Sequence, residues 1–290
     1  MLRGEPMKIV NLILGTVLLI LLLIKMKKGK KYSAYIENLD EEEHPIKEFY
    51  YVGFAWNDTK FLSLRGKMKE KLFGQAKLLY PPKYAEYYAL LAWAQTLSVV
   101  HLVLCAGFLL AGAFDFGFFA LVGVVFAVIL GIYFCTDMNN KLNTRGNECV
   151  VELPEIVSTM ALLINSGMVL REAWKIIAES KEGVVYDLMK ETLIDMGNGM
   201  SDIDAIYKFG IMSNSPEIKK FTSALTQGLE KGSSDLSQFL TNQSSEMWEL
   251  KKQIMLQKGE SAASKLLLPI AMIFIGVLVI VIASAIGMIL

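Results

Sequence analysis

The stretch that decides the fold is residues 266–290, which read LLLPIAMIFIGVLVIVIASAIGMIL. It contains no charged residue. A helix rises about 1.5 Å per residue and the hydrocarbon core of a bilayer is about 30 Å thick, so about 20 apolar residues suffice to cross it. The stretch is therefore predicted to be a transmembrane helix.

Three further apolar runs precede this stretch, and we expect each of them to cross the membrane as well. They cover residues 9–24, 91–114 and 116–135. The first run is short, but Lys8 and Lys25 can reach the two interfaces and let it span. It could instead be the apolar region of a secretory signal peptide. A lysine cluster at 25–31 follows it directly, which favours an uncleaved anchor.

Composition agrees with a membrane protein that also has polar parts. Hydrophobic residues make up 53% of the chain and the mean hydropathy is +0.41, both above the values usual for soluble domains. A wholly soluble enzyme is thereby excluded. The 29 basic residues equal the 29 acidic ones, so the chain lacks the global positive charge that nucleic-acid binding requires.

The basic residues are distributed unevenly, and this predicts the orientation. Segments 25–90 and 136–265 hold thirteen and fourteen of the 29 basic residues, whereas the turn at 111–117 and the C-terminal end hold none. Because basic loops stay on the cytoplasmic side, both segments are predicted to be cytoplasmic. The two termini and the turn around Asp115 are then expected outside.

Residues 32–90 are predicted to be a cytoplasmic linker followed by a helix. The run of four acids at 40–43 is interpreted as solvated chain and not as a metal site. Residues 61–80 have the spacing of a basic amphipathic helix, which Pro81 and Pro82 end. This helix could lie on anionic lipids or pack against the second cytoplasmic segment.

Residues 136–265 are predicted to be an antiparallel helical bundle, because amphipathic segments alternate with short turns. A helix is expected to start near Glu152, with Pro154 in its first turn, and to end at Gly167. Helices at 170–180 and about 184–196 follow, the latter ending before Gly199. The remaining signals are predicted caps and stops: Ser201, Ser215, Gly232 and Asp235. The last helix is expected to continue almost unbroken into the final span.

The sequence shows no motif of catalysis, cofactor binding or metal binding. It lacks a phosphate-binding loop, a G-x-S-x-G elbow, an H-E-x-x-H motif and a G-x-G-x-x-G fingerprint. The three cysteines form no C-x-x-C pair and are interpreted as small buried apolar residues. The histidines, His44 and His101, lie far apart. We therefore expect that the chain is not an enzyme and has no cofactor. His101 and Gln95, both inside a predicted span, are expected to form hydrogen bonds between helices, with a contact to a translocating helix or solute transport as alternatives.

Three stretches carry a family resemblance. They are VELPEIV at 151–157, LINSGMVLREAW at 163–174 and FTSALTQGLEKG at 221–232. Together with the capped long helix and C-terminal span that follow, they resemble the type II secretion system F domain family, over about 136–290. That family includes longer platforms with two such domains. Only one is found here, which resembles the shorter platform proteins of Tad/Flp-type pili.

The resemblance implies an all-α, polytopic membrane protein with about four transmembrane helices and a cytoplasmic bundle. The expected segments are an anchor (1–31), a linker and basic helix (32–90), a transmembrane hairpin (91–135), the bundle (136–265) and a last span (266–290). It implies a non-catalytic platform in the bacterial inner membrane, which couples a cytoplasmic ATPase to pilin or pseudopilin extraction and pairs with a homologous platform or with itself. A structural component of another envelope assembly, such as a sporulation channel, is the alternative, and a small-solute transporter is a third. Seven residues are predicted to shape the bundle or contact a partner, or to be caps and turns only: Glu152, Pro154, Gly167, Glu172, Ala173, Gly199 and Gly232.

Overall fold

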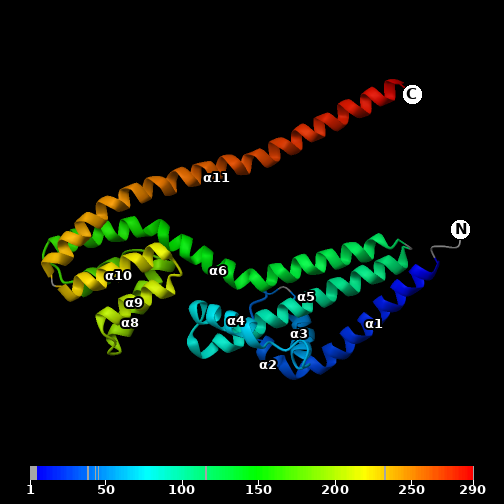
Figure 1. The fold of residues 1–290 in the computed structure, drawn as a ribbon, viewed down its shortest axis with the longest axis horizontal. Coiled ribbons are helices and arrows are strands. Elements are labelled where there is room, and N and C mark those ends of the chain that lie inside the picture. The colour runs from blue at the N-terminus through cyan, green and yellow to red at the C-terminus, as the bar shows by residue number, and fades with distance from the viewer. Residues whose placement is uncertain are drawn as a thin grey trace. The chain divides into compact units, whose positions relative to one another are not determined.

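The computed structural model is all-helical over the residues it describes (Figure 1). These are residues 5–289 apart from 38, 43, 45, 115 and 232, with side chains for 7–278 apart from those five, 231, 233–235 and 268. The predicted turn residue Asp115 and the predicted helix stop Gly232 therefore lie outside the described residues. Four of the described helices are long and apolar enough to cross a membrane, as the sequence predicts. The protein is thus a polytopic, all-α membrane protein.

The chain divides into two compact units, Met1–Thr144 and Arg145–Leu290, and the long helix α6 (Phe118–Asn165) contributes to both. Unit 1 contains, besides the start of α6, the elements α1 (Glu5–Gly29), η1 (Lys30–Tyr32), α2 (Ser33–Ile36), η2 (Lys47–Phe49), α3 (Tyr50–Asn57), α4 (Gly66–Leu79), η3 (Pro82–Tyr84) and α5 (Ala85–Ala113). Unit 2 contains the end of α6 and the elements α7 (Leu170–Ser180), α8 (Val184–Gly197), α9 (Asp202–Met212), α10 (Pro216–Lys231) and α11 (Ser233–Ile289).

Unit 1 contains a buried helix that sequence reasoning missed. The acids Asp40, Glu41 and Glu42 are exposed, in agreement with solvated chain, but α3 packs against both α1 and α5. Gly53 allows α3 to approach α5 closely, because a Cβ atom at this residue would lie 1.8 Å from the carbonyl oxygen of Ala94. The backbone N–H of Gly53 also donates to Oγ of Ser98 on α5 over 2.8 Å.

The basic helix α4 is shorter than the predicted helix at 61–80. It starts at Gly66, whose φ of +58° is left-handed, and a hydrogen bond from the N–H of Leu64 to Oδ1 of Asn57 over 2.7 Å holds the preceding turn. Its apolar side is used within unit 1, since Leu72 and Ala76 are buried against α5 together with Met138 of α6. The sequence predicts that this helix lies on lipid or packs against the second cytoplasmic segment. The apolar side of α4 instead packs against α5 and α6 within unit 1.

Two other predicted helix starts are wrong. The helix expected to begin near Glu152 is the continuation of α6, because Met138, Leu142 and Cys149 are buried along one of its sides and packing carries the helix through this polar stretch. Pro154 therefore lies inside a helix and not in a first turn. The last helix begins at Ser233, so Asp235 is inside α11 and is not its N-cap.

The core of unit 2 is built from every one of its helices. Trp174 of α7 is at its centre: its indole N–H donates to the carbonyl of Met189 over 3.2 Å and its ring meets Phe209 edge-on at 5.1 Å. Successive helices α7 to α11 each contact the next. The two long helices close the core with these buried residues: Leu153, Val157 and Met160 from α6, and Leu236, Leu240 and Met247 from α11.

Candidate functional site

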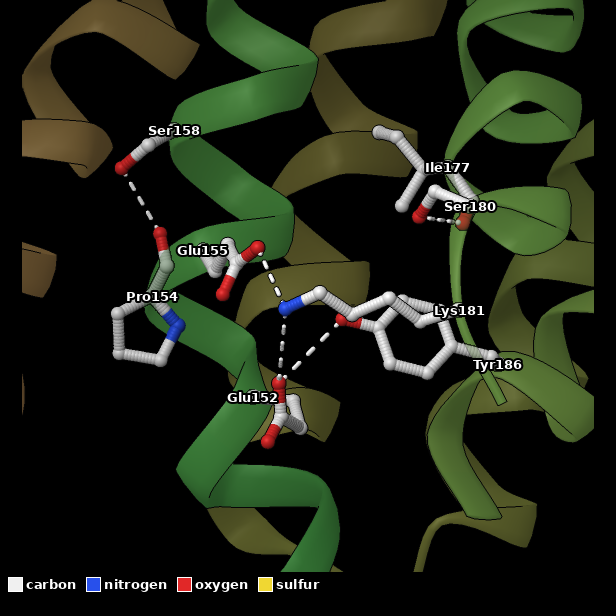
Figure 2. A network of polar contacts seen from close by, with 8 residues as sticks. All are labelled: Glu152, Pro154, Glu155, Ser158, Ile177, Ser180, Lys181 and Tyr186. Carbon is white, nitrogen blue, oxygen red and sulfur yellow. Dashed lines mark hydrogen bonds and ion pairs between the residues drawn. The ribbon is translucent and has the colours of Figure 1, made fainter. Parts of the chain in front are cut away.

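A cluster of charged and polar side chains joins α6 to the loop between α7 and α8 (Figure 2). The Nζ atom of Lys181 lies 2.7 Å from the carboxylate of Glu155 and 3.9 Å from that of Glu152. Tyr186, at the start of α8, donates its hydroxyl hydrogen to Glu152 over 3.3 Å. Because Glu152 and Glu155 are one helical turn apart, both carboxylates reach the same ammonium group.

The charges of this cluster favour a structural contact between α6 and the α7–α8 loop and do not favour proton transfer. Burial, with Glu152 nearby, raises the pKa of the Tyr186 hydroxyl above its ordinary value. The hydrogen bond to Glu155 raises the pKa of Lys181. Both groups therefore keep their protons near neutral pH. Two carboxylates face one ammonium, so the cluster keeps an excess negative charge on a partly exposed surface.

Pro154 lies beside this cluster but does not take part in it. A proline inside a helix removes one backbone hydrogen bond. Ser158, one turn later, donates its hydroxyl to the carbonyl of Pro154 over 2.8 Å, and Ser244 of α11 donates to Oγ of Ser158 over 3.1 Å. Pro154 thereby belongs to a polar contact between α6 and α11.

The contact between α6 and α11 continues at the end of α6. Nδ2 of Asn165 donates to the hydroxyl of Thr241 over 3.1 Å, and the hydroxyl of Ser237 donates to Oδ1 of Asn165. Since Ser158 pairs with residue 244 and Asn165 with residues 237 and 241, the two helices run antiparallel here. Sequence reasoning missed this seam, because small polar residues on a helix carry no distinctive spacing signal.

Two of the predicted residues end helices in the way the sequence indicates. Gly167 has a φ of +97° and Gly199 a φ of +95°, both left-handed. After Gly167 the N–H of Met168 donates to the carbonyl of Leu163 over 3.2 Å, and after Gly199 the N–H of Met200 donates to Asp195 over 3.1 Å. These are the hydrogen bonds of a Schellman cap, which satisfies the last carbonyls of a helix.

The neighbouring residues Glu172 and Ala173 have different environments. Ala173 is fully buried in the core of unit 2, while Glu172 is exposed in the first turn of α7. The nearby Arg171 lies 3.9 Å from Asp202, at the outer limit of an ion pair. The six predicted residues that the structure describes are thus spread over the bundle, and only Glu152 and Pro154 belong to connected polar contacts.

A groove between α10 and α11 is a second feature that sequence reasoning missed. It has a volume of about 260 Å³. Three apolar side chains, three acids, one lysine and two amides line it: Phe221, Met247, Leu250, Glu217, Glu246, Glu249, Lys220, Gln243 and Gln253. A lining that is partly apolar and carries more acids than bases suits a protein surface that presents apolar and basic side chains. In the sequence, the three-residue spacing of Glu246 and Glu249 is the signal that could have indicated an acidic surface on this helix.

The part of the chain that the structure describes contains no metal-binding cluster and no disulfide bond. No group of three or more His, Cys, Asp or Glu side chains there is placed to hold a metal ion. Cys105, Cys135 and Cys149 are free thiols, and Cys105 and Cys149 are buried.

The helical bundle and its membrane helix are similar to a known protein family. Residues 156–284 match the family described as type II secretion system (T2SS), protein F. Unit 2 therefore carries a type II secretion system F domain. The match begins inside α6, includes α7 to α10 and ends near the end of α11. No curated protein and no solved structure matches the chain.

Residues 156–284 are thus similar to a family whose members are structural membrane components. The family boundaries leave unit 1 outside the match.

Proposed function

We propose that this protein is a non-catalytic inner-membrane platform of a type II secretion or Tad-like type IV pilus machine. It couples a cytoplasmic ATPase to the extraction and assembly of pilins. The observation that carries the proposal is helix α11, which is part of the bundle core at one end and is a membrane span at the other.

Helix α11 has three parts, which follow from burial and charge. Leu236, Leu240 and Met247 belong to the core of unit 2. Every side chain that is described from 255 to 278 is exposed. Residues 251–265 carry four lysines and one glutamate, and the uncharged stretch begins at 266. A stalk of about 22 Å at 1.5 Å per residue thus separates the bundle from the membrane helix. A continuous helix of this kind transmits a displacement of the bundle to the span.

The distribution of basic residues supports a cytoplasmic bundle. Segment 136–265 holds fourteen of the 29 basic residues, and segment 25–90 holds thirteen. By the positive-inside rule both lie in the cytoplasm, and the two termini lie outside. An ATPase in the cytoplasm then has direct access to the bundle, while the spans are available to the apolar helix of a pilin.

The polar cluster around Lys181 supports a structural role for the bundle. Lys181 and Tyr186 keep their protons near neutral pH and fasten the α7–α8 loop to α6. The groove between α10 and α11 offers a partly apolar lining with three acids and one lysine to a basic partner surface. With one F domain in the chain, that partner is the ATPase, a homologous platform or a second copy.

The test is a clean deletion in the bacterium that encodes the protein. Surface pili are counted by electron microscopy, and the secretion-type ATPase is sought among proteins that co-purify with a tagged, complementing copy. We expect loss of pili, recovery on complementation and co-purification of the ATPase. Normal piliation in a strain that also lacks any second platform would contradict the proposal.

A further inference from the structure

An apolar groove lies between α5 and α6 in unit 1, apart from the F domain. Its volume is about 520 Å³. Its lining is apolar except for Thr136 at one end, and includes Val100, Leu104, Val124, Val128, Ile132 and Met68. The floor is formed where the helices approach closely: a Cβ atom on Gly131 would lie 3.1 Å from Cγ2 of Val100.

The length of the groove fits one leaflet of a bilayer. Along α6 it extends from Val124 to Thr136, which is about 18 Å at 1.5 Å per residue. Half of the hydrocarbon thickness is about 15 Å. Helix α6 is uncharged from Phe118 to Thr136 and its first charge is Asp137. The groove therefore runs from the polar boundary to about the bilayer centre, which matches one acyl chain and is too short for a helix that crosses the membrane.

The polar end of the groove lies next to unpaired positive charge. Met68 also lines the groove and belongs to α4, a helix with four lysines and one glutamate. One turn later in α4, Leu72 shares a buried cluster with Met138 of α6, two residues beyond Thr136, which assigns Met68 to this end. Lys71 stands three residues after Met68 and so neighbours it on the helix surface, while Arg65 is the residue directly before the start of α4. Both are exposed, and neither forms an ion pair with any described residue, whereas Lys69 pairs with Glu86 at 3.0 Å.

We propose that this groove binds an anionic phospholipid. One acyl chain occupies the groove between α5 and α6, and Arg65 and Lys71 bind the phosphate of the headgroup. Basic residues near a bilayer favour anionic lipids, and the apolar lining favours the chain. This site serves unit 1 alone and holds whether or not the protein is a pilus platform.

The first experiment compares two lipids on the purified full-length protein. The protein in detergent is mixed with equal amounts of dioleoyl phosphatidylglycerol and dioleoyl phosphatidylcholine, and retained lipid is counted by native mass spectrometry. We expect preferential retention of phosphatidylglycerol, and loss of that preference at high salt because ions screen exposed charges. Equal retention of the two lipids by the native protein overturns the proposal even before any variant is made.

Charge-reversal variants locate the headgroup. Each basic residue near an anionic surface contributes a factor of about five, so R65E/K71E should lower phosphatidylglycerol binding roughly 25-fold. The matched control is K77E/K83E, in which Lys77 lies on the opposite side of α4 from Met68 and Lys83 lies beyond its end. The control should bind like the native protein. An unchanged lipid preference in R65E/K71E overturns the proposed headgroup site.

A filling variant tests the groove itself. Val128→Trp adds bulk to one wall, and Val125→Trp makes the same change on α6 at an exposed residue outside the lining. We expect Val128→Trp to lower retention of the lipid while Val125→Trp does not. If Val128→Trp instead leaves lipid retention unchanged and dissociates a dimer, the groove receives a helix of a second copy and the lipid proposal is wrong.

Discussion

The indole N–H of Trp56 on α3 donates a hydrogen bond to Nδ1 of His101 on α5 over 3.0 Å. Because tryptophan can only donate, Nδ1 of His101 must be the acceptor. The proton of the neutral imidazole is then on Nε2, which lies 3.0 Å from the carbonyl oxygen of Leu18 on α1 and donates to it. His101 is buried and so ties three helices of unit 1 together. It forms the hydrogen bonds between helices that its place in a span predicts.

His101→Phe should therefore destabilise unit 1. The variant leaves the indole N–H of Trp56 without its partner, and such an unsatisfied group costs about 1–3 kcal/mol when buried. It also removes the second hydrogen bond of the Leu18 carbonyl, which lies inside α1. The measurement is the free energy of unfolding in mixed micelles titrated with a denaturing detergent. Gln95→Leu is the control, because the Gln95 side chain, also on α5, forms no hydrogen bond with any residue that the structure describes. Equal effects of the two changes would contradict the proposed role of His101.

Gly53→Ala should detach α3 from α5. The added Cβ atom would lie 1.8 Å from the Ala94 carbonyl oxygen, which belongs to backbone and cannot move aside alone. Trypsin should then cleave faster at Lys47 and Lys60, which flank α3. Gly74→Ala on α4 is the control: its Cβ atom meets nothing within 4 Å, and it should stabilise its helix by about 0.5–1 kcal/mol. Unchanged cleavage in Gly53→Ala would show that α3 is not held by this contact.

Local chemistry made much of unit 2 predictable from sequence. The N–H of Asp204 donates to Oγ of Ser201 over 3.1 Å, and the N–H of Ile218 donates to Oγ of Ser215 over 3.2 Å, as expected of helix caps. Such bonds depend on residues only three positions apart.

Contacts between distant residues were not predictable in this way. The ion pair of Lys181 with Glu155 and the burial of α3 both depend on how helices pack. Neither produces a recognisable spacing of residues in the sequence. The same reason explains why α6 passes through Pro154: tertiary packing on both sides of it outweighs the local tendency of proline to start a helix.

Two glycines near the end of α8 should respond to alanine with opposite signs. Gly199 is left-handed with a φ of +95°, so Gly199→Ala should lower the free energy of unfolding by about 1–2 kcal/mol. Gly197 is the last residue of the helix and an added Cβ atom meets nothing within 4 Å, so Gly197→Ala should raise it by about 0.5–1 kcal/mol. Hydrogen exchange of the α8 amides in the full-length protein measures both. A loss of the same size in both variants would be inconsistent with the Schellman cap.

Asp58 should give unit 1 a stability that acid removes. Burial alone would raise the pKa of this carboxyl, but hydrogen bonds from Lys31 and Tyr32 outweigh burial and hold its pKa below the ordinary 3.8. A carboxyl whose pKa is lowered by folding stabilises above its unfolded pKa and loses that contribution as the pH falls through the folded value. Asp58→Asn should be less stable than the native protein at neutral pH, with a difference that narrows below pH of about 4. Melting temperatures measured across this range test the sign, and a constant difference would contradict it.

Helix α11 offers a test of mechanical coupling that leaves the bundle intact. Gly259 lies in the stalk between the buried residue Met247 and the membrane stretch that begins at 266, and a Cβ atom there meets nothing within 4 Å. Gly259→Pro removes a backbone hydrogen bond and breaks the helix at a local cost of about 3 kcal/mol. Gly259→Ala stiffens the same position by about 1 kcal/mol.

If the proposed platform works by moving its last span with its bundle, Gly259→Pro should abolish surface pili while Gly259→Ala keeps them. Both variants should insert into the membrane, and both should retain the ATPase on co-purification, because the bundle core ends before the stalk. Pili are counted in complemented deletion strains with matched protein levels. Wild-type piliation with Gly259→Pro would mean that force does not pass through a rigid α11, even if the protein is a platform. Loss of the ATPase from Gly259→Pro would mean instead that the stalk itself takes part in docking.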